Sequence, residues 1–413
     1  MRQANGNMKT VAAAIEFGTS KIITLIAESG SFTRCEIVGS GTVPYAGYSN
    51  GEWNDREGLL PAIEAAVNAA ETEAKRRIQE IYVGVPSEYI HVTTAIGETE
   101  ILSQDGRVTE DEILRVMDDA ADQLNLGEAG GNVLHRSPAW FSVDGGRHTM
   151  SPIGTKGRRL QALVSFIQAD PYFIEDVREC LAEIGLEVSA FLAPTLGMAI
   201  LLMSFDERDK TPVLIDVGYL NTEISVVEGD AITFHAVLPI GGGDMTAELA
   251  QALEISMDEA EAIKRDYIFT PDEFDVQSDP EVRLEDGSVV TFPRAFVSQT
   301  IEGVTDELVD DIIETFKFAD EYIAARSQVY ITGGGLVNMR GSKEYLAEKL
   351  KRSVRIPVVK AARLNNPRFS SSLGLMDLVF DAVEQEAQIR GDDQSAGRLK
   401  GLKNIFKKQS TDE

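Results

Sequence analysis

Short apolar runs of strand type alternate along the chain with stretches whose apolar residues recur at helical spacing. Runs at 11–15 and 22–28, and again at 212–215 and 223–227, are bounded by polar turns, which is typical of buried strands. Residues 55–77 instead show the periodicity of an amphipathic helix. Because strands and helices alternate in this way, the pattern predicts an α/β fold.

The two pairs of predicted strands enclose turns of the same type. Residues 16–21 and residues 216–222 each contain an acidic residue, a glycine two positions later and then a hydroxyl residue. A glycine permits a tight turn, and hydroxyl and backbone N–H groups can donate hydrogen bonds to phosphate oxygens. One such turn is more often structural, but its recurrence about 200 residues later indicates two related halves that face one ligand. We therefore predict a nucleotide clamp.

Two further glycine runs lie at positions suited to nucleotide binding. Residues 241–243 directly precede a predicted helix, where backbone N–H groups can approach an anion. Residues 333–335 end a short buried strand, where the lack of side chains lets a purine or ribose come close to the backbone. Glu261 and Lys264 share one face of the helix predicted between these runs.

Two stretches read as insertions into the duplicated core. Residues 87–165 suggest a small α/β subdomain, in which Thr109 caps a helix with an acidic first turn. Residues 268–300 contain a predicted hairpin over 282–291, with an Asp-Gly turn. A long amphipathic helix is predicted over 299–326.

Composition narrows the classes of protein to which the chain can belong. With 413 residues it is too long for one ordinary core, so two domains or one bilobed fold is expected. A formal charge of −28 argues against nucleic acid as a partner, because the phosphate backbone would be repelled. The two cysteines have no metal-ligand spacing and favour a reduced cytosolic chain. The sequence shows no signal peptide and no apolar run of about 18 residues, the length that spans a bilayer.

The C-terminal residues carry a pattern of their own. Drawn as a helix, residues 398–409 place apolar side chains on one side and cations on the other. The apolar side consists of Leu399, Leu402, Ile405 and Phe406, and the cationic side includes Lys400, Lys403 and Lys407. Such a helix on an acidic protein is typical of a membrane-surface anchor, although docking on the chain's own body or on a protein partner also fits. Residues 384–397 read as a flexible linker, which favours an external surface.

The two hairpin turns and the glycine run at 333–335, in this order, resemble the actin/Hsp70/sugar-kinase ATPase superfamily. Within it the chain resembles the FtsA family of bacterial cell-division proteins, because the small insertion and the tethered basic tail are both present; the resemblance covers residues 8–408. It implies a bilobed actin-like ATPase fold of two duplicated domains with a small inserted subdomain and a C-terminal amphipathic helix. The implied first domain covers 8–86 and 166–209, on either side of the insert 87–165. The implied second domain covers 210–383 and has its own insertion at about 245–310. The linker 384–397 and a membrane-targeting helix at 398–409 follow.

By this resemblance the chain would bind ATP with Mg²⁺ between its domains. The β- and γ-phosphates would be held by the first turn, through Gly18, Thr19, Ser20 and Lys21. Gly218 and Thr222 would contact the phosphates, and Gly242 and Gly243 would approach the γ-phosphate. Glu261 and Lys264 would contact the ribose or adenine. The adenosine and α-phosphate would lie against Gly333, Gly334 and Gly335. Asp216, the candidate catalytic residue, and Glu16 would hold Mg²⁺ through water.

Two departures from the family pattern bear on catalysis. Glu16 stands where the superfamily usually has aspartate, and the extra methylene moves the carboxylate by about 1.5 Å. Tyr219 and Leu220 stand where the family has glycines and would obstruct a close approach of the backbone to the phosphates. ATP binding is therefore better supported than turnover, and slow or absent hydrolysis is expected.

As a protein of FtsA type, the chain is expected to polymerise head to tail, with filament contacts from the inserted subdomain. It would bind the C-terminal tail of the tubulin-like FtsZ, meet other division proteins and lie peripherally on anionic lipid at the cytoplasmic face of the bacterial inner membrane, at the division site. Candidate contacts for the acidic FtsZ tail are Lys264, Arg265, Arg283 and Arg294. Two alternatives stay open: a pilus-assembly relative of FtsA, which ordinarily lacks such a tail, and a small-molecule kinase of the same superfamily.

Overall fold

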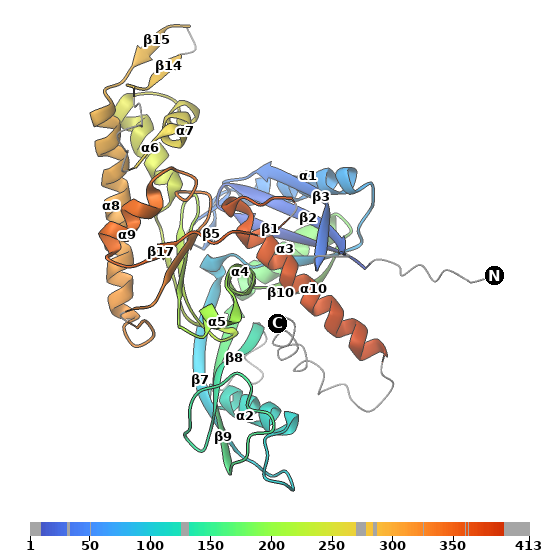
Figure 1. Cartoon of the computed structure of the whole chain (residues 1–413). Coiled ribbons are helices and arrows are strands. Elements are labelled where there is room, and N and C mark those ends of the chain that lie inside the picture. The colour runs from blue at the N-terminus through green and yellow to red at the C-terminus, as the bar shows by residue number, and fades with distance from the viewer. Residues whose placement is uncertain are drawn as a thin grey trace, which may run out of the picture.

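The computed structural model describes residues 10–30, 34–49, 51–124, 132–269, 278–283, 287–324, 326–359, 361 and 363–391. Two five-stranded sheets form the body, and a three-stranded sheet extends below them in Figure 1. An apolar core of its own packs against each of the three sheets. The bilobed body with a small third unit, expected from the sequence, is confirmed.

The first sheet combines an antiparallel meander with parallel strands. Its order is β3-β2-β1-β6-β10, in which β1, β2 and β3 are antiparallel neighbours, and β1, β6 and β10 are parallel. The strands are β1 (Val11–Gly18), β2 (Lys21–Ser29), β3 (Cys35–Pro44), β6 (Glu80–Gly84) and β10 (Glu187–Leu192). A short hairpin of β4 (Tyr48–Ser49) and β5 (Glu52–Trp53) precedes α1 (Arg56–Ala74). Helix α1 packs closely on β3, where a Cβ on Gly41 would lie 1.9 Å from the Ala66 carbonyl oxygen.

The second sheet repeats this topology. Its order, β13-β12-β11-β16-β17, again joins an antiparallel meander to parallel strands. The strands are β11 (Val213–Val217), β12 (Thr222–Glu228), β13 (Ala231–Leu238), β16 (Val329–Thr332) and β17 (Val354–Arg355). Each predicted turn connects the first two strands of its sheet, β1 to β2 and β11 to β12. The internal duplication inferred from those turns is therefore present in the fold.

A helical extension covers the outer end of the second domain, at the left of Figure 1. Its elements are α6 (Gly242–Leu253), α7 (Met257–Asp266), β14 (Glu281–Arg283), β15 (Val289–Thr291), α8 (Arg294–Phe318) and α9 (Ser342–Leu350). β14 and β15 pair as the predicted hairpin. Helix α8 begins and ends earlier than the predicted 299–326, because Pro293 precedes its first turn and the chain turns inward at the fully buried Ala319.

The inserted subdomain lies between the first and second parts of the first domain. It begins at η1 (Ser87–Tyr89) and contains β7 (Ile90–Glu100), α2 (Glu110–Gln123), β8 (Val133–Val143) and β9 (Arg159–Ala169), with sheet order β7-β9-β8. Thr109 begins α2 as predicted, and its backbone N–H donates to the Glu112 carboxylate at 2.9 Å. β9 runs past the predicted boundary at 165, since it pairs with β7 along its whole length.

The last helix, α10 (Ser370–Gly391), crosses the first domain and leaves it at the lower right of Figure 1. It packs on α4 (Pro194–Leu202) where a Cβ on Gly197 would lie 2.2 Å from the Gly374 carbonyl oxygen. Residues 384–391 of the predicted linker are therefore helical, whereas the predicted membrane-targeting helix lies outside the described residues. Within the described residues, no helix has the length and apolarity to cross a bilayer. The remaining elements are α3 (Pro171–Glu183), α5 (Phe205–Arg208) and η2 (Pro367–Phe369).

A histidine at the junction between the insert and the first domain is expected to make stability depend on pH. The Ala193 N–H donates to Nε2 of His135 at 2.8 Å, and burial lowers the pKa of His135 to about 4 from 6.5. Between these values the unfolded chain binds a proton that the native chain excludes. The free energy of unfolding should therefore fall as pH is lowered from 6.5 to 4, by at most about 1.4 kcal/mol per pH unit. His135→Gln, which keeps an acceptor, should flatten this slope in urea unfolding, and equal slopes would contradict the assignment.

Candidate functional site

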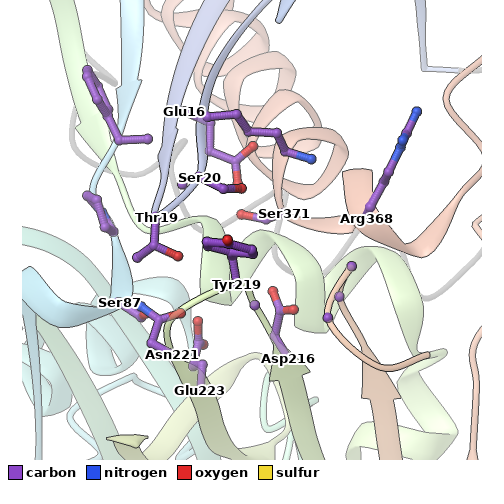
Figure 2. Close-up of a pocket in the computed structure, with 18 of the residues that line it drawn as sticks. Glu16, Thr19, Ser20, Ser87, Asp216, Tyr219, Asn221, Glu223, Arg368 and Ser371 are labelled. Carbon is purple, nitrogen blue, oxygen red and sulfur yellow. The ribbon is translucent and has the colours of Figure 1, made fainter. Parts of the chain in front are cut away.

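A cleft of about 580 Å³ lies between the two domains, at the ends of β1 and β11 (Figure 2). Both hairpin turns, the glycine run after β16 and the first turn of α10 line it. The predicted site residues that line the cleft are Glu16, Gly18, Thr19, Ser20, Lys21, Asp216, Gly218, Glu261, Lys264, Gly333, Gly334 and Gly335. The structure therefore brings most of the predicted set together from segments far apart in the chain.

The two hairpin turns meet across this cleft. The Leu220 N–H donates to Oγ1 of Thr19 at 3.1 Å, and Thr19 is only 5% exposed. Because Oγ1 accepts in this bond, the hydroxyl proton of Thr19 remains available to a ligand. Figure 2 shows Thr19 and Asn221, one from each turn, beside the same space. The duplicated turns thus face one cavity, as the sequence indicated.

The first turn brings a carboxylate and an ammonium group to the cleft. The Ser372 hydroxyl donates to Oε2 of Glu16 and ties this carboxylate to the start of α10. Nζ of Lys21 lies 5.2 Å from the centre of the Phe369 ring. Burial lowers the pKa of Lys21, against the opposing effect of Glu16. An anion in the cleft would stabilise the charged form of this ammonium group.

Asp216 occupies the opposite wall, near the end of β11. Burial, and then the charges of Glu223 and Glu16, raise the pKa of Asp216 to about 8. Glu223 lies across from Asp216 on β12 and accepts a hydrogen bond from Ser225 at 3.2 Å. Burial and the neighbouring carboxylates therefore favour the protonated form of the Asp216 carboxyl, and a cation in the cleft would favour its ionised form.

Two glycines of the run after β16 are required by close backbone packing. Gly333 has φ +98°, and a Cβ there would lie 2.2 Å from Oδ1 of Asp216. A Cβ on Gly335 would lie 2.2 Å from the Gly218 carbonyl oxygen. At Gly334 a Cβ would meet the Arg368 Cβ at 3.1 Å. Gly333 and Gly335 thus allow the loop to pack on the second turn, whatever the cleft binds.

The start of α6 does not line the cleft, in contrast to our prediction for Gly242 and Gly243. The Gly242 N–H donates to the Gly218 carbonyl at 3.0 Å, and the Gly243 N–H donates to the Tyr219 carbonyl at 2.6 Å. Each N–H has one proton, so neither can bind a phosphate while these bonds persist. Thr222 is also outside the cleft lining, because it is fully buried and donates to the Ile240 carbonyl at 2.7 Å.

Glu261 and Lys264 on α7 line the far end of the cleft but are bonded to each other. Nζ of Lys264 lies 2.6 Å from Oε2 of Glu261, and it donates to the Gly242 carbonyl at 2.7 Å and to Oγ1 of Thr246 at 2.8 Å. These partners satisfy all three ammonium protons, and Lys264 is only 4% exposed. Its predicted contact with the FtsZ tail is therefore wrong, since Lys264 joins α6 to α7 in the interior. Arg265 beside it is exposed and pairs with Glu261.

Several lining residues were not assigned a site role from the sequence. They are, among others, Ser87, Asn221, Glu223, Arg368 and Ser371 (Figure 2). Arg368 and Ser371 come from the segment that precedes and starts α10, which matches no nucleotide motif. The available signal was an Asn-Pro pair followed by an arginine and three serines, which is typical of a helix start.

The carboxylates of the cleft do not form a metal site by themselves. Within the part of the chain that the structure describes, no group of three or more His, Cys, Asp or Glu side chains is arranged to hold a metal ion. Mg²⁺ is usually held by one or two carboxylates together with substrate phosphates. Glu16 and Asp216, which line opposite walls, fit a metal that arrives with a phosphorylated ligand.

Comparison with known proteins places this arrangement in a family. The model of cell division protein FtsA matches residues 213–374, and the model of the SHS2 domain inserted in FtsA matches residues 87–168. Cell division protein FtsA of Pseudomonas aeruginosa is 27% identical over 371 residues, which cover 88% of this chain and 87% of that protein. FtsA of Neisseria meningitidis is 27% identical over 380 residues, with 88% and 89% covered. The chain belongs to the FtsA family.

Solved structures similar to this FtsA-family chain share its fold. The PilM–PilN type IV pilus biogenesis complex has a TM-score of 0.60 at 17% identity, covering 88% of this chain and 97% of that chain. MreB5 of Spiroplasma citri bound to ADP has a TM-score of 0.55 at 11% identity, with 91% and 98% covered. These likenesses confirm the actin-like fold. The two family models favour FtsA over the pilus-assembly relative and the small-molecule kinase.

Proposed function

We propose that this chain is an actin-like ATP-binding protein that polymerises on the cytoplasmic membrane and anchors the FtsZ ring during cell division. Family membership supports the division role. The observation that carries the nucleotide part is the convergence of two equivalent hairpin turns and the loop 333–335 on one cleft. An MreB5 of the same fold has been solved with ADP, which is consistent with this assignment.

In the proposed complex the triphosphate lies between the two turns. Thr19 and Ser20 would donate hydroxyl hydrogen bonds, and Lys21 would supply a charge to the β- and γ-phosphates. The adenosine would lie along the loop 333–335, with its base toward the Glu261–Lys264 pair. Lys264 and Glu261 pair with each other, so an uncharged purine can lie beside them.

Mg²⁺ bound with the nucleotide would be held through water by Asp216 and Glu16, and it would neutralise phosphate charge. Because the pKa of Asp216 is raised to about 8, ionisation of this carboxyl would be coupled to the arrival of the cation. Glu16 is longer than the aspartate usual in the superfamily, and it is engaged by Ser372. A carboxylate that is displaced and already bonded orders an attacking water poorly, so we propose slow or absent hydrolysis.

The membrane and FtsZ parts of the proposal rest on the sequence and on the position at which α10 ends. Helix α10 starts at the cleft and ends at Gly391, close in the chain to the basic amphipathic segment 398–409. That segment would bind anionic lipid on the cytoplasmic face of the inner membrane at the division site. Arg265 and Arg283 are exposed on the outer part of the second domain and remain candidates for the acidic FtsZ tail. Arg294 is partly buried over the Tyr267 ring and fits this role less well.

Turnover measurements with and without Asp216 test the nucleotide assignment. We expect the full chain to bind ATP with Mg²⁺ and to hydrolyse it far more slowly than about 1 s⁻¹. Asp216→Ala should weaken Mg²⁺-dependent ATP binding about tenfold, whereas Asp206→Ala, at an exposed carboxylate on α5, should not. Turnover at about 1–100 s⁻¹, as in kinases, that is abolished by Asp216→Ala would contradict the proposal.

A further inference from the structure

Four backbone N–H groups around the second turn already have acceptors within the protein. The Gly218 N–H donates to the Asn221 carbonyl at 2.8 Å, and the Gly242 N–H donates to the Gly218 carbonyl at 3.0 Å. The Gly335 N–H donates to the Val217 carbonyl at 2.8 Å. Gly243 donates in the same way to Tyr219. These bonds hold the second turn, α6 and the loop 333–335 together. An anion in this cleft therefore needs donors other than these backbone N–H groups on its second-domain side.

Arg368 of η2 is a cation at the edge of the same cleft (Figure 2). Its guanidinium carbon lies 4.6 Å from the centre of the Phe369 ring, and its Cβ lies beside Gly334. Its side chain makes no ion pair with any residue that the structure describes. Arg34 and Arg208, by contrast, pair with carboxylates of α10 and of Asp230. An arginine without an ion pair among the described residues, on a chain of formal charge −28, is available to a ligand.

Arg368 and Lys21 lie on the same ring from different parts of the chain. Nζ of Lys21 is 5.2 Å and Cζ of Arg368 is 4.6 Å from the Phe369 centroid, so the two charges lie within about 10 Å of each other. A nucleoside diphosphate or triphosphate is long enough to touch both. Ser20 and Ser371 line the cleft with them and add two hydroxyl groups. The cationic side of the cleft is thus formed by the first turn and by η2.

We propose that Arg368 is a phosphate ligand of this site and that it supplies, together with Lys21, donors in place of the four occupied backbone N–H groups. The proposal rests on the proposed nucleotide-binding function and names the side chain that recognises the polyphosphate. The planar guanidinium can donate two parallel hydrogen bonds to one phosphate group. Contact with the Phe369 ring limits the positions from which the guanidinium donates.

Titration calorimetry with three ligands tests this role. Wild type, Arg368→Gln, Arg368→Lys and Arg363→Gln are compared as full chains, with MgATP, inorganic tripolyphosphate and adenosine as ligands. Arg363 is the matched control, because it lies in the same segment but pairs with Glu73 outside the cleft. Arg368→Gln should bind ATP and tripolyphosphate about tenfold to a hundredfold more weakly, and Arg363→Gln should stay within about twofold of wild type. Arg368→Lys should recover part of the loss, since it keeps the charge without the fork.

The ligands separate failure of this inference from failure of the proposed function. Unchanged ATP and tripolyphosphate affinity in Arg368→Gln overturns the role of Arg368 and leaves ATP binding intact. Tripolyphosphate binding that depends on Arg368, without tighter binding of ATP, supports the anion site but removes the nucleotide assignment. A wild-type chain that binds neither MgATP nor tripolyphosphate overturns both the role of Arg368 and the proposed nucleotide binding. Equal loss of adenosine binding in Arg368→Gln shows a general distortion of the cleft and also overturns the role of Arg368.

Discussion

Replacing Gly335 by alanine is expected to weaken ATP binding at least about tenfold and to lower the free energy of unfolding by roughly 1–3 kcal/mol. A Cβ at this position would lie 2.2 Å from the Gly218 carbonyl oxygen and 2.9 Å from the Gly242 nitrogen. Both atoms belong to the backbone and are engaged in hydrogen bonds, so the loop after β16 must move instead. That loop forms the proposed adenosine wall. Calorimetric titration and urea unfolding measure the two effects.

Gly303→Ala, in the middle of α8 and outside the cleft lining, is the control for this substitution. A Cβ at Gly303 would meet no atom within 4 Å, so nothing has to move. We expect its ATP affinity to stay within about threefold of wild type. Equal losses in both variants would contradict the packing argument, and an unaffected Gly335→Ala variant would contradict the geometry of the cleft wall itself.

Phe406→Glu is expected to release the full chain from anionic vesicles. Phe406 belongs to the apolar side of the segment 398–409, where a buried side chain contributes roughly 1.5–3 kcal/mol. A carboxylate at that position removes this contribution and is repelled by anionic lipid. Because one short segment binds weakly, polymerisation would be needed to multiply the attachment along a filament. Vesicle co-sedimentation measures the loss, and formation of polymers in solution should persist.

Ser410→Glu provides the same change of charge beyond the apolar stripe. It should leave most of the vesicle binding in place, since no apolar contact is lost. Membrane binding that survives Phe406→Glu would remove the tail from its assigned role. Loss of binding in both variants would instead indicate that net charge alone, without the apolar side, governs attachment.

Local patterns accounted for much of the fold. The repeated turn between two strands revealed the duplication, and the capping residue Thr109 and the hairpin of β14 and β15 were recognised from a few neighbouring residues. Boundaries were less predictable. β9 continues past 165 because its partner β7 continues, and α10 reaches into the predicted linker as the continuation of a helix packed on α4. Such limits depend on contacts that a local pattern does not contain.

By itself, the sequence determined that two equivalent turns and a third glycine loop belong to one actin-like body, because a repeated motif records the duplication directly. Only the tertiary structure decided which of their groups remain free. The N–H groups of Gly242 and Gly243 donate to carbonyls of the second turn. The ammonium group of Lys264 is bonded between α6 and α7. Arg368 lines the cleft although it lies in a segment without a recognised motif. The physical reason is that the availability of a donor depends on its partners, and here several of those partners lie 20 or more residues away along the chain.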